Sequence, residues 1–186
     1  PDEKKSYVRI ISDNSEMLLT MVGDLLDLSE MEAGEMTFRK SRSSLNDICS
    51  SSLDSYAAKV GEGVSLVFVP HDPDKIMDVD RQRIAQVLRN YISNAVKNTV
   101  KGSITVDYAD DPEERKVTFS VTDTGCGVPP EKAEEIFVRF EKLDVFKEGT
   151  GVGLSICRSI ADGMKAEAKL DVSYTGGARF LFILPY

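Results

Sequence analysis

The chain has 186 residues and a formal net charge of −8, from 31 Asp and Glu against 23 Lys and Arg. This length accommodates one domain with a sizeable core, and the acidic balance argues against a general nucleic-acid binder while leaving room for a local basic pocket for a phosphorylated ligand. Three cysteines and one histidine are too few for a disulfide framework or a metal cluster. The odd number and wide spacing of the cysteines make a reducing, cytoplasmic setting the default. No apolar run approaches the ~20 residues of a membrane-spanning helix.

Residues 7–31 have the apolar periodicity of a helix. Ile11, Leu18 and Leu25 recur every seven residues, and further apolar residues widen the stripe beyond a two-stranded seam. The helix is expected to end at Gly34, because glycine commonly follows the last residue of a helix. The wide stripe predicts a long N-terminal helix that packs in a helical bundle, with partners from another chain. Packing on the chain's own domain is the alternative.

The rest of the chain alternates between strand and helix signals without internal repeats. Asp80 is a suitable N-cap for a long helix that is expected to reach about Thr99. A polar turn is expected over 109–112. The pattern predicts strands over 36–45, 64–70, 75–79, 103–108, 116–123, 169–173 and 179–184, and further helices over 46–60, 131–140 and 154–164. One sheet with helices packed on it is the economical architecture.

The long helix carries polar side chains at helical spacing. Asn90, Asn94 and Lys97 fall at positions i, i+4 and i+7, so they project from one face. Two carboxamides and an ammonium on one stripe can ligate Mg²⁺ through a carbonyl oxygen and neutralise phosphate. An ordinary solvated helix face is the alternative.

A second cluster follows the strand that ends at Asp123. Gly125 and Gly127 alternate after it, and glycines at alternate positions let the backbone approach a flat ligand. A carboxylate at the strand end can accept a hydrogen bond from an exocyclic amine such as that of adenine, and it would oppose the carbonyl of guanine. An Asp turn with glycines at positive φ is the alternative.

A third cluster is the glycine run 149–153, which leads directly into a helix. Backbone N–H groups at such a helix N-terminus form an anion site for phosphates. The spacing matches neither the P-loop nor the dinucleotide fingerprint. The fourth cluster, residues 136–148, mixes aromatic and cationic side chains; this is typical of a flap that closes over a ligand, or of a plain helix end and loop.

In this order, the four clusters resemble the ATP-binding catalytic domain of bacterial sensor histidine kinases, within the Bergerat-fold ATPases. Residues 24–34 are similar to the end of the second helix of that family's dimerisation hairpin. The four clusters resemble the N box (90–97), the first glycine box (123–127), the F box (137–140) and the second glycine box (149–154).

The resemblance implies an α/β fold with two parts. Residues 1–34 would be the second helix of the dimerisation hairpin, and residues 35–186 the ATP-binding catalytic domain. The catalytic domain would be a two-layer α/β sandwich of Bergerat type, with a mixed sheet and its helices on one face. A homodimer through the N-terminal helix is also implied.

The resemblance assigns roles to matched residues. Asn94 corresponds to the family's Mg²⁺-binding asparagine, and Asp123 to the carboxylate that recognises adenine. Lys97 corresponds to a cation that contacts phosphate, and Lys142 to a cation that reaches the terminal phosphate from the lid. The implied cofactors are ATP and Mg²⁺, and the remaining members of the implied ATP-binding set are Gly125, Gly127, Gly149, Thr150, Gly151, Gly153 and Leu154.

Asn90 indicates a kinase within this superfamily. ATP-hydrolysing relatives place a glutamate there as the base for water, and an amide cannot take up that proton. The resemblance thus implies Asn90, Lys97 and Lys142 as the candidate catalytic residues. The implied reaction transfers the γ-phosphoryl group to a histidine and then to an aspartate on a response-regulator receiver domain. An ATP hydrolase and a degenerate, non-catalytic module are the alternatives.

The sequence also departs from the family pattern. The family's phosphoacceptor histidine lies on the first dimerisation helix, whereas His71 lies between two expected strands. We therefore expect a fragment that does not autophosphorylate alone, with any membrane association through a sensory portion outside it. Asn98 replaces an aromatic residue that stacks beside adenine, and Ala178 replaces a hydroxyl residue, which predicts weakened ATP binding.

Overall fold

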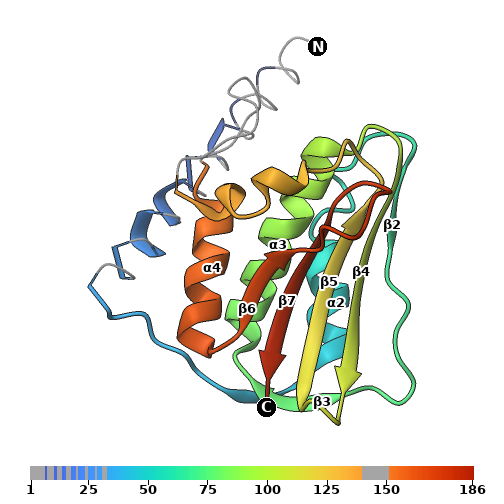
Figure 1. Ribbon diagram of the computed structural model, residues 1–186. Coiled ribbons are helices and arrows are strands. Elements are labelled where there is room, and N and C mark those ends of the chain that lie inside the picture. Colours follow the sequence, from blue (N-terminus) through green and yellow to red (C-terminus); the bar gives the residue numbers. More distant parts are fainter. Residues whose placement is uncertain are drawn as a thin grey trace.

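The computed structural model describes residues 7, 11, 14–15, 18–19, 21–23, 25–27, 29–30, 33–139 and 151–186. Beyond residue 40, these residues form a two-layer α/β sandwich (Figure 1). A five-stranded sheet makes one layer, and the helices lie together on one of its faces. The predicted fold class is confirmed.

The main sheet is mixed. Its strands run in the order β2-β4-β5-β7-β6, with β2 parallel to β4 and every other pair antiparallel. A separate antiparallel ribbon joins β1 to β3. The strands are β1 (Ser41–Ser44), β2 (Val64–Val67), β3 (Ile76–Val79), β4 (Gly102–Asp111), β5 (Lys116–Asp123), β6 (Glu167–Leu170) and β7 (Arg179–Pro185).

The helical layer consists of α2 (Leu45–Asp54), α3 (Arg81–Asn98) and α4 (Gly153–Met164), with 3₁₀ turns η1 (Pro130–Lys132) and η2 (Glu135–Phe137). Helix α3 begins where its cap signal predicts, because the Asp80 carboxylate accepts a hydrogen bond from the Arg83 N–H at 3.0 Å. The other oxygen of Asp80 accepts from the Arg39 N–H at 2.6 Å. Asp80 therefore connects the segment before β1 to the first turn of α3.

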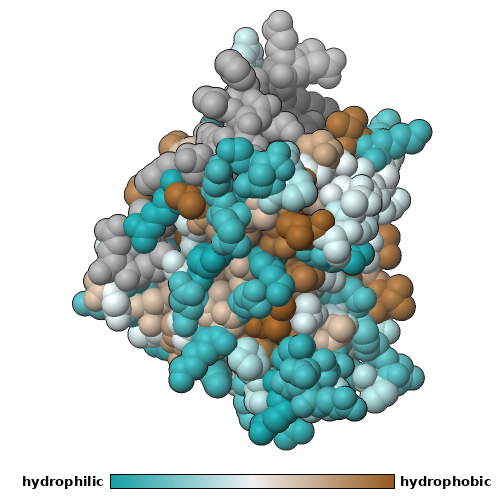
Figure 2. Space-filling view, viewed as in Figure 1, coloured by the Kyte–Doolittle hydropathy of each residue, from teal (hydrophilic) through white to brown (hydrophobic). Residues whose placement is uncertain are grey.

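The core lies between the sheet and the helices. Alternate residues of β5 are buried, with Val117, Phe119 and Val121 fully enclosed, while α3 buries residues at helical spacing. Tyr91 of α3 stacks on Phe180 of β7, with 5.0 Å between ring centroids. Figure 2 shows small hydrophobic patches among hydrophilic side chains on the visible face. The core therefore fixes α3 against the centre of the sheet.

Two predicted helices are wrong in extent. The helix expected over 46–60 ends at Asp54. Serine hydroxyls bond back to helix carbonyls, with Ser52 donating to the Ile48 oxygen at 2.7 Å, and such bonds compete with helix continuation. The segment expected as a helix over 131–140 instead forms η1 and η2 in its described part, after two consecutive prolines.

Strand boundaries differ from the prediction in both directions: pairing lengthens one strand, and a local turn shortens another. β4 continues to Asp111, which pairs with Lys116, so the turn lies at 112–115 and not at 109–112. β6 ends at Leu170 because the Asp171 carboxylate accepts a hydrogen bond from the Ser173 N–H at 3.0 Å and forms a turn. β1 and β2 are shorter than the expected strands over 36–45 and 64–70.

The described residues between 7 and 30 have helical backbone. The residues between them lie outside the description, so one long helix and its role in dimerisation stay predictions. Ile11, Leu18 and Leu25 are exposed in this chain. Among the described residues, no helix combines the length and hydrophobicity that crossing a bilayer requires.

Candidate functional site

Three of the sequence clusters lie at one end of the sandwich, where α3 and β5 end and α4 begins (Figure 1). The Asn90 carboxamide of α3 donates a hydrogen bond to the Gly153 carbonyl at 3.1 Å, which connects α3 to the first residue of α4. At the end of α3, the Asn98 carbonyl lies against Gly125 in the loop after β5. The fold thus brings the polar helix stripe next to both glycine clusters.

Asp123 is the buried carboxylate of this region, with 2% of its surface exposed. Its Oδ1 accepts hydrogen bonds from the Gly125 N–H at 2.8 Å and from the Ala178 N–H at 3.2 Å. Burial raises the pKa of this carboxyl group above its usual range, and the two N–H groups oppose that shift. Among the described residues no donor bonds to Oδ2, so this oxygen keeps its capacity to accept a hydrogen bond.

The glycines beside Asp123 allow backbone to pack on backbone. A Cβ on Gly125 would lie 2.3 Å from the Asn98 carbonyl oxygen. Gly127 has φ +72°, and its Cβ would lie 2.9 Å from the Gly177 oxygen. Gly177 has φ +152°, and its Cβ would lie 2.1 Å from the Asp123 carbonyl oxygen. These glycines are therefore required by the protein's own packing around the carboxylate.

The N-terminus of α4 has no side-chain cap. Val152 occupies the cap position without a side-chain hydrogen bond, and the Ser155 hydroxyl donates to the Val152 carbonyl at 2.8 Å. Among the described residues, no side chain therefore caps the first N–H groups of Gly153 and Leu154, at a helix end that favours anions. This arrangement suits a phosphate group.

The residues of the predicted polar stripe have two different roles in the structure. Asn90 is engaged with Gly153, and a Cβ on that glycine would lie 3.4 Å from the Asn90 carboxamide carbon. Asn94 is half-buried, and no described residue bonds to its carboxamide. Lys97 is exposed in the last turn of α3. Asn94 and Lys97 thus remain the candidates for contact with a ligand, while Asn90 orients α4.

Some of the predicted site residues lie outside the residues that the structure describes. The sequence prediction also missed contacts that hold Asp123. Gly149, Thr150 and Lys142 belong to residues 140–150, which the structure does not describe. The sequence placed Ala178 near the adenine but did not predict its N–H bond to Asp123, and it missed the contact of Gly177 with the Asp123 backbone. The consecutive glycines at 176 and 177 were the available signal for such a close approach.

Comparison with known proteins assigns the chain to a family. Residues 79–186, more than half of the chain, match the family described as "Histidine kinase-, DNA gyrase B-, and HSP90-like ATPase". The chain belongs to this family. Its members' description implies ATP binding for this domain, in agreement with the resemblance drawn from the sequence clusters.

The similar proteins are histidine kinases and two-component proteins. Two-component system protein A of Emericella nidulans is 33% identical over 88% of the chain and 25% of its own length. Full-length ShkA, solved in complex with AMPPNP, has 26% identity and a TM-score of 0.81 over 98% of the chain and 39% of ShkA. ThkA, solved in complex with response regulator protein TrrA, has 26% identity and a TM-score of 0.72 over 100% of the chain and 52% of the ThkA chain.

The chain is therefore an ATPase domain homologous to the catalytic domains of sensor histidine kinases. It spans only 9% to 25% of the length of three curated relatives that it matches.

Proposed function

We propose that this chain is the ATP-binding catalytic region of a two-component sensor histidine kinase, with residues 35–186 as its catalytic domain. The observation that carries the proposal is the Asp123 carboxylate, which two backbone N–H groups fix through one oxygen while the other oxygen is left to a ligand. An exocyclic amine such as that of adenine can donate to this oxygen, and a carbonyl cannot.

The phosphates of ATP would lie at the other side of the site. The first N–H groups of α4 at Gly153 and Leu154 would donate to them, together with Gly151, whose φ is +69°. Lys97 from α3 would add a positive charge, and Lys142 is proposed to do so from the lid. The adenine and phosphate subsites are held together because Asn90 joins α3 to α4.

The Asn94 carboxamide fits a magnesium ligand. Its oxygen has no described partner, and Mg²⁺ commonly takes one or two protein oxygens beside phosphate oxygens and water. The described residues contain no group of three His, Cys, Asp or Glu side chains that could hold a metal ion. When bound, Mg²⁺ neutralises charge on the phosphates.

Asn90 distinguishes phosphoryl transfer from hydrolysis. Its amide nitrogen already donates to the Gly153 carbonyl, and an amide does not accept a proton from water at neutral pH. We therefore infer that the site retains ATP for a histidine acceptor outside this sequence. An ATP hydrolase is the alternative that a phosphate-release assay tests, and a non-catalytic module is the alternative that a transfer assay tests.

The proposed partners follow from the relatives and from the N-terminal residues. ThkA was solved with a response regulator, so a receiver domain with an acceptor aspartate is the proposed target of relay. The exposed apolar residues at 18, 19, 25 and 26 suit a helical homodimer interface. Any membrane attachment would come from a sensory portion outside this sequence.

Two measurements test the proposal. A fluorescent ATP analogue with Mg²⁺ should bind the chain, and Asp123→Asn should weaken binding while Asp78→Asn, an exposed control on β3, should not. A separate chain that carries the acceptor helix should then gain label from γ-labelled ATP. Binding without transfer would favour the non-catalytic module, steady phosphate release would favour the hydrolase, and unaltered binding by Asp123→Asn would refute the assigned site.

A further inference from the structure

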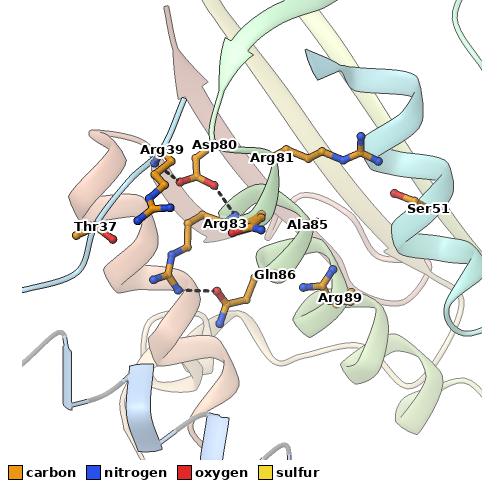
Figure 3. Close-up of a pocket in the computed structure, with 10 residues that line it drawn as sticks. Thr37, Arg39, Ser51, Asp80, Arg81, Arg83, Ala85, Gln86 and Arg89 are labelled. Atoms are coloured by element: carbon orange, nitrogen blue, oxygen red, sulfur yellow. Dashed lines mark hydrogen bonds between the residues drawn. The ribbon is translucent and has the colours of Figure 1, made fainter. Parts of the chain in front are cut away.

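A hollow lies at the opposite end of α3 from the proposed nucleotide site (Figure 3). Its volume is about 770 Å³, and its lining includes Arg39, Arg81, Arg83 and Arg89. Arg81 and Asn94 are 13 positions apart, which corresponds to about 20 Å along the helix axis. The hollow is therefore separate from the proposed nucleotide site, and nothing in the proposed function uses it.

The hollow concentrates positive charge in an acidic protein. Four of the ten arginines in the sequence line it, although the formal net charge is −8. Asp80 is the carboxylate in its lining, and both Asp80 oxygens already accept backbone N–H groups. Among the described residues, the Arg39, Arg81 and Arg89 side chains have no carboxylate partner.

Donors at the rim of the hollow already bind carboxylates of the chain itself. The Arg83 guanidinium donates to the Asp27 carboxylate at 2.8 Å, and its second nitrogen lies 3.4 Å from Glu30. The Gln86 amide donates to the other Asp27 oxygen at 2.5 Å. Two side chains of α3 thus bind one carboxylate of the chain's own N-terminal segment in a two-point contact, the geometry in which such donors bind an oxyanion.

The free guanidinium groups come from different elements. Arg39 lies in the segment before β1, whereas Arg81 and Arg89 lie two turns apart on α3. Arg81 extends toward α2, which carries the Ser51 hydroxyl at the same hollow (Figure 3). A planar guanidinium donates in a fixed fork that matches phosphate oxygens, and a phosphate accepts from several directions at once.

We propose that this hollow binds a small phosphorylated anion with more than one phosphate group. The concave shape and the spread of donors over three elements favour a compact multivalent anion over a flat protein surface. Binding would join the segment that carries Arg39 to α2 and to the start of α3, the helix whose other end carries Asn94 and Lys97. The site is independent of the adenine-recognising carboxylate.

Inorganic tripolyphosphate is the probe, because it has no base for Asp123 to recognise. Calorimetry and ¹⁵N amide shifts are measured on the wild-type chain, on Arg81→Gln/Arg89→Gln and on Lys116→Gln/Lys169→Gln. The lysine pair removes the same charge from partly exposed strand positions on the main sheet that line neither site. We expect amide shifts at 39 and 81–89, and about tenfold or greater loss of affinity in the arginine variant only.

Four results would overturn the proposal, three of them with tripolyphosphate alone. Those three are no binding to the wild-type chain at millimolar probe, equal losses in both double variants, and shifts confined to 151–155 at the start of α4. Preference for a glutamate-rich peptide over tripolyphosphate would also overturn it, in favour of a protein partner. Binding of the fluorescent ATP analogue to the arginine variant provides a separate readout, so failure here leaves the proposed nucleotide site independently measurable.

Discussion

Replacing Asp123 by asparagine separates ligand recognition from folding at this site. The asparagine Oδ1 can still accept from the Gly125 and Ala178 N–H groups, so the backbone contacts are kept. The second carboxylate oxygen is replaced by an NH₂ group. A hydrogen-bond donor would then face the ligand amine in place of an acceptor. A hydrogen bond to a charged group contributes about 1.5–3 kcal/mol, which corresponds to an affinity loss of about 10- to 140-fold.

Asp123→Ala should behave differently, because it leaves two buried N–H groups without an acceptor. At about 1–3 kcal/mol for each group, the free energy of unfolding should fall by about 2–6 kcal/mol. Titration with a fluorescent ATP analogue measures the first effect, and urea denaturation measures the second. Equal nucleotide affinity in wild type and Asp123→Asn, with Asp78→Asn as control, would show that this carboxylate does not contact the base.

Comparison of the wild type with Asp123→Asn also gives a pH dependence of the free energy of unfolding with a defined sign. Burial raises the folded-state pKa of Asp123, so the unfolded chain releases this proton at lower pH than the folded chain. The contribution of Asp123 to stability is therefore fully present below the unfolded pKa and is lost as the pH rises through the folded pKa. The stability of Asp123→Asn relative to wild type should increase over that range. A constant or decreasing difference would contradict the desolvation argument.

Three further outcomes are expected. Gly177→Ala places a Cβ 2.1 Å from the carbonyl oxygen that ends β5, so the free energy of unfolding should fall by more than about 1 kcal/mol; an unchanged urea midpoint would contradict this. Asn90→Ala removes the hydrogen bond to Gly153 and should cost about 1 kcal/mol of stability and also weaken ATP binding, whereas a loss of stability alone would refute its orienting role. Burial raises the pKa of Cys49 to about 12, so iodoacetamide should modify the exposed Cys126 first in native protein, and equal rates would contradict the observed burial.

The sequence alone predicted the elements whose signals are local. Asp80 and the 3.6-residue period located α3, and strict alternation located β5. The order of the glycine and asparagine clusters was enough to indicate the ATPase family. These features depend on capping, side-chain period and backbone freedom, which neighbouring residues determine.

Only the tertiary structure decided how the clusters work together. Asn90 bonds to a carbonyl 63 positions away, and Asp123 bonds to an N–H 55 positions away, so neither contact leaves a local pattern. Strand pairing extended β4 through residues that favour a turn. The arginine hollow likewise combines segments around residues 39, 51 and 81–89. Contacts between distant segments depend on the packed sheet and helices, because only the folded core brings those segments within hydrogen-bond distance.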